Sequence, residues 1–218
     1  MSERSGRNGA RLEERLRLVV LTHPRPACGR PLEVVVRECV AAGATAIQLR
    51  DKEADAEDLY DRACRLLPVV EDAGALLVVN DRFDVALAAG AHGVHLGPGD
   101  LPVGAVRAAV PDAFLIGAST DDPETGRRLA ASGADYLGVG AVFGTRSKPG
   151  LADEAIGPAR IAEVRVASGI PCVGIGGITD ENAGEVFSVA DGVAVLSAVM
   201  SAPDPARAVR AILRSRSG

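Results

Sequence analysis

The sequence predicts an α/β protein built as a single (β/α)8 barrel, the TIM-barrel architecture. Eight short apolar segments alternate with helical patterns, which indicates a parallel sheet. A motif of a helix end, a small residue and an apolar strand recurs along the chain. Polar residues gather after the strands, where such barrels carry their chemistry. A doubly wound sheet is the alternative, but nothing in the sequence marks a reversal of strand order.

The recurring motif supplies half of the expected strands. Gly43, Gly90 and Gly133 each follow a helical pattern and precede an apolar strand, and a weaker copy begins at Val189. The three glycines lie 47 and 43 positions apart (90−43 and 133−90), which is too far for one βα unit and right for two. We therefore expect strands within 42–50, 89–97, 132–140 and 189–197, and between them at 18–22, 76–80, 114–119 and 171–177.

Helical patterns fill the intervals between these strands. Asp122 is a suitable N-cap before Pro123 at the first helical position, whereas Pro68 predicts a kink or an early end of its helix. We expect residues 1–16 to form a flexible polar tail and residues 17–218 to form one catalytic domain. The expected helices cover 32–42, 56–73, 103–109, 123–131, 158–167, 181–189 and 205–214.

The composition argues against several classes of function. A net charge of −5 disfavours nucleic acid as the main partner, and an aromatic content of 3% leaves no platform for stacking bases. No apolar run reaches membrane-spanning length, and the polar N-terminus lacks the apolar core of a secretory signal. Cys28, Cys39, Cys64 and Cys172 are scattered, so we expect reduced thiols and a cytoplasmic protein. The expected partners are small molecules, and the sequence leaves a homo-oligomer open.

One strand carries charge on a face that a barrel would bury. Gln48, Arg50 and Lys52 are spaced by two, so on a strand they share one face. Ile47 and Leu49 then point to the other face. Two cations on one face need an anion, which either protein carboxylates or a ligand supplies. The remaining strand ends favour a ligand that carries phosphate.

Polar residues also end the neighbouring strands. Asn80 and Asp81 end one strand, Asp100 follows the next, and Ser119 ends the one after. Two carboxylates together with substrate phosphate oxygens suit Mg²⁺, whereas no Cys or His pair has the spacing that zinc needs. The alternative is that Asp81 caps a helix beginning near Phe83 and that Asp100 sits in a turn.

A loop after the sixth strand carries hydroxyl and ammonium donors among glycines. Thr145, Ser147 and Lys148 could wrap a pyrophosphate, although an ordinary solvated loop would look similar. Barrels often bind a phosphate after the seventh and eighth strands, where this chain has Gly176-Gly177 and Leu196-Ser197.

The histidines give weaker evidence about function than these strand ends do. His95 lies in the middle of a strand, where we expect an interior residue with satisfied hydrogen bonds rather than a catalyst. His23 ends the first strand and could face the site. No Ser-His-Asp or Cys-His arrangement is evident.

Taken together, these segments resemble the thiamine-phosphate synthase (thiamine-phosphate pyrophosphorylase) family. The resemblance covers nearly the whole chain after the tail, and the motifs are specific as a set. The segments are 48–52, 80–82, 93–97 with 100, 138–140 with 142–143 and 145–148, 174–178 and 192–197.

The resemblance implies a transferase of thiamine biosynthesis. Such an enzyme joins hydroxymethylpyrimidine diphosphate to hydroxyethylthiazole phosphate and releases pyrophosphate. It also implies Mg²⁺ as cofactor, held by Asp81 and Asp100. The implied catalytic residues, which stabilise the departing charge, are Lys148, Arg50, Lys52 and Ser119. The implied substrate-binding residues are Gln48, Arg50, Lys52, Asn80, Ser119, Thr145, Ser147, Lys148, Gly177, Leu196 and Ser197.

The sequence also departs from the family pattern. His23 stands where the family has an Asp, Asp121 where it has a His, and Ala141 and Gly144 where it has Pro. Ser147 replaces a Thr and keeps the hydroxyl. Two alternatives therefore stay open: a thiazole tautomerase of the same fold, and a non-catalytic protein that binds a phosphate ligand.

Overall fold

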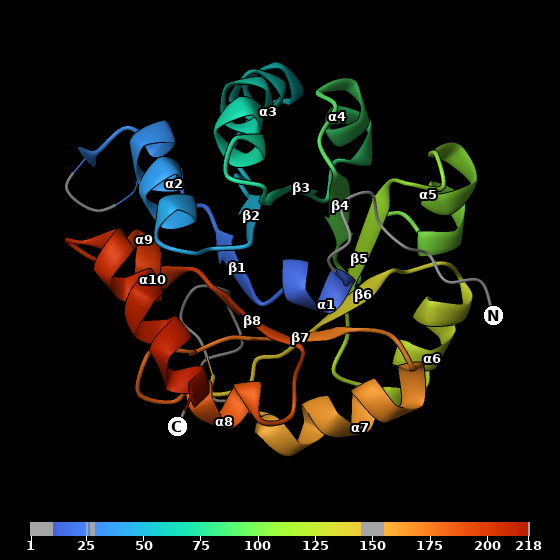
Figure 1. Cartoon of the computed structure of the whole chain (residues 1–218). Helices are drawn as coiled ribbons and strands as arrows, with labels where there is room; N and C mark the ends of the chain where they lie inside the picture. Colours follow the sequence, from blue (N-terminus) through green and yellow to red (C-terminus); the bar gives the residue numbers. More distant parts are fainter. Residues whose placement is uncertain (1–10, 25, 27–28, 145–154, 218) are drawn as a thin grey trace.

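The computed structural model describes residues 11–24, 26, 29–144 and 155–217. Eight parallel strands follow one another in sequence order around a closed barrel, and β8 pairs with β1 (Figure 1). Helices surround this ring, which confirms the predicted (β/α)8 architecture. The strands are β1 (Leu18–Leu21), β2 (Ala46–Leu49), β3 (Leu76–Asn80), β4 (Gly93–Leu96), β5 (Leu115–Ser119), β6 (Tyr136–Val139), β7 (Cys172–Ile175) and β8 (Gly192–Val195).

The helices largely follow the sequence pattern. Asp122 caps α6 by accepting a hydrogen bond from the Thr125 N–H at 2.7 Å, as predicted. Pro68 does not end its helix, because α3 continues to Glu71. We did not predict α9, and a helix at the position of α4 entered only through the alternative role of Asp81. The helices are α1 (Leu12–Arg15), α2 (Leu32–Ala41), α3 (Ala56–Glu71), α4 (Phe83–Ala88), α5 (Val103–Ala109), α6 (Pro123–Ala131), α7 (Pro158–Ser168), α8 (Ala183–Phe187), α9 (Ser197–Met200) and α10 (Pro205–Arg214).

Each strand separates two apolar layers. Ile47 and Leu49 of β2 are fully buried in the layer between strands and helices. Burial of an aliphatic side chain of this size contributes about 1.5–3 kcal/mol. Ala46 points the other way, into a smaller apolar cluster inside the barrel. The two-faced pattern is therefore confirmed for residues 46–49. The strand ends at Leu49, however, so Arg50 and Lys52 lie in the loop after it and not on the predicted strand face.

The N-terminal end of the barrel explains the recurring motif. Beneath each even-numbered strand, one polar side chain accepts a hydrogen bond from a backbone N–H of the preceding strand. The four acceptors are Thr45, His92, Asp135 and Asp191, and their donors are the backbone N–H groups of Leu18 (2.9 Å), Leu77 (3.1 Å), Ile116 (2.8 Å) and Cys172 (2.9 Å). We call these four side chains the basal acceptors. The recurring motif thus places a hydrogen-bond acceptor where a backbone N–H of the preceding strand needs one.

The N-terminal segment ends in a short helix. We expected a polar tail over 1–16 that could turn helical from Ala10 onward, and residues 12–15 do form α1, which lies over the ring of strands in Figure 1. Leu16 is fully buried in the apolar cluster inside the barrel. Burial of this leucine at the open end of the barrel stabilises the helix before it. Packed structure therefore begins before residue 17, and residues 1–10 lie outside the described ranges.

Candidate active site

A cavity of about 160 Å³ opens at the C-terminal end of the barrel. Five of the predicted site residues line it: Arg50, Ser119, Gly177, Leu196 and Ser197. The remaining wall consists of Leu21, Gly138, Gly140, Ala141, Ile175, Gly176, Ile178, Ala194 and Val195. The site therefore combines one guanidinium and two hydroxyls with a largely apolar wall.

The end of β2 is held by both neighbouring strands. The Thr22 hydroxyl, which follows β1, accepts a hydrogen bond from the Arg50 N–H at 2.9 Å. Gln48 is 5% exposed, and its Nε2 donates to Asn80 Oδ1 at 2.7 Å. These contacts fix the backbone from which Arg50 projects and join two of the predicted site residues.

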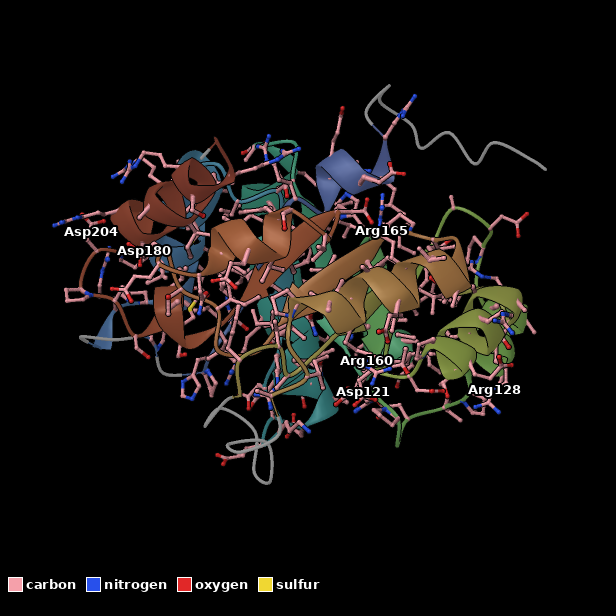
Figure 2. The ribbon with its side chains drawn as sticks, turned by 90° about the horizontal axis from the view of Figure 1, so that it is seen from below. Asp121, Arg128, Arg160, Arg165, Asp180 and Asp204 are labelled. Carbon is pink, nitrogen blue, oxygen red and sulfur yellow. The ribbon has the colours of Figure 1, made fainter. Side chains whose placement is uncertain are left out.

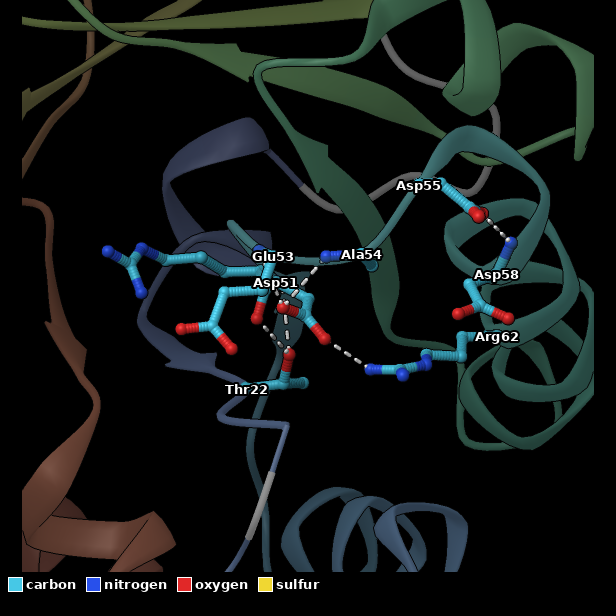
Figure 3. Close-up of polar contacts among 8 residues, drawn as sticks. Thr22, Asp51, Glu53, Ala54, Asp55, Asp58 and Arg62 are labelled. Atoms are coloured by element: carbon cyan, nitrogen blue, oxygen red, sulfur yellow. Dashed lines mark hydrogen bonds and ion pairs between the residues drawn. The ribbon is translucent and has the colours of Figure 1, made fainter.

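Asp51 organises the turn between Arg50 and Lys52. Its carboxylate accepts from the N–H groups of Glu53 (3.0 Å) and Ala54 (3.3 Å), and it pairs with Arg62 of α3 at 2.5 Å (Figure 3). Burial acts to raise the pKa of Asp51, but these hydrogen bonds and the Arg62 charge hold it below its usual value. The carboxylate that lies between the two cations in the sequence is therefore already paired with another arginine.

Arg50 and Lys52 thus remain available to a ligand, although both charges also act on Asp81. Neither forms an ion pair with a carboxylate among residues 11–24, 26, 29–144 and 155–217. Of the two anion sources that the sequence left open, this favours a ligand.

Asp81 and Asp100 lie together beside these cations. Asp81 follows β3 with a left-handed backbone (φ 65°), and its N–H donates to the His95 carbonyl at 2.9 Å. Burial, a hydrogen bond with Asp100 and the Asp100 charge raise the pKa of Asp81 to about 6, against the opposing charges of Lys52 and Arg50. Asp100 also accepts from the Gly97 N–H at 2.6 Å. Two carboxyl groups that raise each other's cost of ionisation are a suitable pair of ligands for a divalent cation, which would relieve their repulsion.

This arrangement fits Mg²⁺ only if a ligand completes the coordination. The described residues contain no group of three His, Cys, Asp or Glu side chains that could hold a metal. Mg²⁺ commonly takes one or two carboxylates and completes its shell with phosphate oxygens and water. The alternative role of Asp81 as a helix cap is not observed, because α4 begins after Arg82 without a side-chain cap. Asp100 does lie in a turn, which is the alternative position that the sequence offered for it.

Ser119 lies within hydrogen-bond distance of a histidine in the interior of the barrel. His95 Nε2 lies 2.9 Å from Ser119 Oγ, and His95 Nδ1 lies 3.1 Å from the Tyr136 hydroxyl. Burial lowers the pKa of His95 to about 4, with the Asp100 charge acting against it. The expectation of an interior histidine is confirmed, but its contact with Ser119 was not foreseen.

The loop after β7 forms another part of the cavity wall. Gly176 and Gly177 adopt φ values of 101° and 66°, and a side chain at Gly177 would collide with the Gly144 carbonyl. Asn182 Nδ2 donates to the Gly177 carbonyl at 3.0 Å and holds the loop in place. Ser197 follows at the first position of α9.

Some predicted residues are not placed by the structure. Thr145, Ser147 and Lys148 lie outside the described residues. In contrast, sequence reasoning missed Thr22, Asp51 and Tyr136. A polar residue in an otherwise aliphatic strand end was the available signal for Thr22, and none was available for the pairing of Asp51 with Arg62.

Comparison with known proteins decides the family. The family model described as thiamine monophosphate synthase (TMP-TENI) matches residues 18–199. The chain belongs to this family. A thiamine-phosphate synthase of Methanoculleus marisnigri is 46% identical over 196 residues, covering 89% of this chain and 92% of the relative. One of Natronomonas pharaonis is 44% identical over 193 residues, covering 88% and 90%.

A solved structure agrees with the fold. The thiamine phosphate pyrophosphorylase from Pyrococcus furiosus superposes with a TM-score of 0.86 at 38% identity, covering 95% of this chain and 98% of its own. Membership of the thiamine monophosphate synthase family confirms the predicted resemblance. It also confirms that the chain is a transferase, of the thiamine-phosphate diphosphorylase class, with a role in thiamine biosynthesis.

Proposed function

We propose that this member of the family joins hydroxymethylpyrimidine diphosphate to hydroxyethylthiazole phosphate, with Mg²⁺-assisted release of pyrophosphate. The observation that carries the proposal is that Arg50 and Lys52, which form no ion pair among the described residues, act on the neighbouring carboxyls of Asp81 and Asp100. That combination suits a diphosphate accompanied by a divalent cation, because anionic oxygens and carboxylates then share the metal.

In this proposal the end of β2 binds the pyrimidine diphosphate. Gln48 and Asn80, joined by their hydrogen bond, present amide groups to the pyrimidine side, and Arg50 and Lys52 contact the diphosphate. Asp81 and Asp100 would hold Mg²⁺, which supplies charge neutralisation for the leaving group when it is bound. Ser119 donates to a diphosphate oxygen from the cavity wall.

The bond between the pyrimidine methylene and the diphosphate oxygen breaks, and its electron pair leaves with pyrophosphate. The aminopyrimidine ring stabilises the cation that remains, and the thiazole nitrogen donates the electron pair of the new C–N bond. Arg50, Lys52 and Ser119 stabilise the departing charge, so the site needs no nucleophile. The loop residues Thr145, Ser147 and Lys148 are proposed to contact the same pyrophosphate.

The opposite wall is proposed to receive the thiazole phosphate. Gly177 exposes backbone because no side chain fits there, and Ser197 adds a hydroxyl, with Leu196 beside it. The Asn182 contact with the Gly177 carbonyl keeps this wall in place. The two substrates would then meet across the cavity with the nitrogen aimed at the methylene carbon.

The decisive experiment follows pyrophosphate release with each substrate omitted in turn and with Mg²⁺ removed by chelation. The proposal requires release only when both substrates and Mg²⁺ are present. A thiazole tautomerase would rearrange its substrate without diphosphate or metal, and a binding protein would show saturable affinity without turnover. Either of those outcomes would contradict the proposal.

We also propose that the protein works in the cytoplasm on small phosphorylated substrates. The thiols of Cys39, Cys64 and Cys172 are free, which suits a reducing compartment. No helix of the described residues has the length and hydropathy needed to cross a membrane.

A further inference from the structure

A chain of three polar side chains crosses the interior of the barrel beneath the cavity. Tyr136 of β6, His95 of β4 and Ser119 of β5 follow one another at 3.1 and 2.9 Å. Tyr136 is 3% exposed and His95 is 8% exposed. A side chain at Gly117 would overlap the Tyr136 ring, and one at Gly138 would come within 3.0 Å of His95. The barrel therefore makes room for this chain by omitting two side chains.

The hydrogen count decides which ring nitrogen carries the proton. The His95 ring is buried, and among the described residues its two nitrogens contact only hydroxyl groups and no carboxylate, so we take the ring as neutral with a single N–H. Among the described residues, His95 Nδ1 is the only hydrogen-bond partner of the buried Tyr136 hydroxyl. A proton on Nδ1 would leave the buried Tyr136 O–H without an acceptor, which is unfavourable. A proton on Nε2 lets Nδ1 accept from Tyr136 and uses every buried donor.

We propose that Tyr136 and His95 are positioning residues that fix Ser119 as a hydrogen-bond donor to an anionic oxygen in the cavity. With the proton on Nε2, His95 donates to Ser119 Oγ. The Ser119 hydroxyl proton cannot point back along the same hydrogen bond, so it is offered to the cavity that Ser119 lines. Arg50 lines the same cavity, and its guanidinium has only hydrogen-bond donors. Arg50 and Ser119 therefore both favour a ligand that accepts hydrogen bonds.

The direction of this chain distinguishes one class of ligand from another. A phosphate or pyrophosphate oxygen accepts from Ser119, whereas an ammonium group would find its approach unfavourable. The identification of the ligand as pyrophosphate rests on the proposed function. The position of the His95 proton does not, so the two can be tested separately.

The first test is the tautomer itself. Long-range ¹H–¹⁵N NMR spectra of the full chain with ¹⁵N-labelled histidine separate the two neutral tautomers. His92 serves as an internal reference, because its Nδ1 accepts from the Leu77 N–H and its proton must lie on Nε2. His95→Gln and His92→Asn assign the signals. We expect the His95 proton on Nε2, and a spectrum with the proton on Nδ1 would overturn the proposal.

The second test is a double-mutant cycle on the binding of magnesium pyrophosphate, measured by calorimetry. We expect Tyr136→Phe to weaken binding by about threefold to tenfold when Ser119 is present and to have no effect in Ser119→Ala. A merely structural role of Tyr136 would weaken both equally, and that result would overturn the proposal.

A pair of substitutions at His95 sharpens the cycle. The amide of Gln reaches about as far as Nε2 and can still donate to Ser119, whereas the shorter Asn reaches only the Nδ1 position. We expect His95→Gln to bind magnesium pyrophosphate more tightly than His95→Asn, and the reverse order contradicts the proposal. If the unmodified protein binds no pyrophosphate, the proposed function fails, and the tautomer spectrum still decides the role of His95.

Discussion

The two ends of the barrel use similar polar side chains for opposite purposes. At the N-terminal end, the basal acceptors Asp135 and Asp191 bind backbone N–H groups and pair with Arg107 and Arg165. At the C-terminal end, Arg50 and Lys52 have no such partner among the described residues. Figure 2 separates the ends: Arg165 lies toward the edge that carries α1, and Asp121, which follows β5, lies toward the opposite edge. Residue type thus says little about role until the partners are known.

The difference has an energetic meaning. A carboxylate satisfied by its own protein contributes to stability, and its loss leaves a buried N–H or charge uncompensated. Carboxyls that crowd one another, as Asp81 and Asp100 do, cost stability until a ligand relieves them. Substitutions at the two ends should therefore separate activity from stability.

The largest effect is expected at Asp81. Asp81→Asn should lower kcat by about 10²–10³-fold, because one of the two carboxylates proposed for the metal is lost. Its stability should rise by about 1 kcal/mol at pH 8, a figure reduced for solvent screening at this half-buried site, because the folded state no longer holds two crowded charges. Steady-state kinetics across a Mg²⁺ titration and urea unfolding measure both.

The control for this variant is Asp84→Asn on the neighbouring helix α4. Asp84 is exposed and pairs with Arg82, so its loss should leave both quantities nearly unchanged. Unaltered Mg²⁺ dependence in Asp81→Asn would remove Asp81 from the metal site.

The opposite effect, a loss of stability without a loss of turnover, is expected at Asp135. Asp135→Ala should reduce the free energy of unfolding by about 3 kcal/mol, because the Ile116 N–H and Arg107 both lose a largely buried partner. Turnover of the folded protein should not change. Chemical denaturation gives the first value, and Glu163→Ala, which removes an exposed ion pair with Arg160, is the matched control. A comparable loss of kcat would show that the two ends are coupled.

Two glycines with nearly the same φ sharpen the comparison. Gly177 (φ 66°) lies in the cavity wall, whereas Gly169 (φ 68°) ends α7, and a methyl group added there would meet no atom within 4 Å. Gly169→Ala should cost about 1 kcal/mol of stability from backbone strain alone. Gly177→Ala should cost more and also raise KM for the thiazole phosphate about tenfold, because the methyl group collides with the Gly144 carbonyl. Equal KM values for the two variants would place the phosphate elsewhere.

The smallest effect is a pH dependence at the N-terminal end. Burial lowers the pKa of His92 below its usual value near 6.5, and its Nδ1 must stay unprotonated to accept from Leu77. Between pH 6.5 and the lower folded-state pKa the unfolded chain binds more protons, so stability is complete above pH 6.5 and falls with falling pH. His92→Asn keeps an acceptor without a titrating group and should show a shallower loss between about pH 7.5 and 5 in denaturant titrations. His95 titrates in the same direction, so some slope should remain.

Much of the architecture could be predicted because it depends on local pattern. The alternation along β2 assigned Ile47 and Leu49 to one face and Gln48 to the other, since side chains of a strand alternate by geometry. The motif around Gly43, Gly90 and Gly133 gave half of the strands. Its meaning, a basal acceptor beneath each even strand, was not visible, because the donor lies on the preceding strand 15 to 27 residues away.

The candidate site, like the fold, was predictable only in part. The polar strand ends pointed to Arg50, Ser119 and Asp81 from sequence, since the C-terminal ends of parallel strands meet at one rim. The sequence could not show that Asp51 forms its ion pair with Arg62 rather than with the adjacent Arg50 or Lys52. It likewise could not show that His95 links Tyr136 to Ser119 across the barrel.

By itself the sequence determined the number of strands, their two faces and the rim at which the chemistry lies, because hydrophobic periodicity and chain order are local properties. Only the tertiary structure decided which charges are neutralised and which stay available. That choice depends on distances between charged atoms up to 32 residues apart in the chain, and those distances exist only once the barrel has closed.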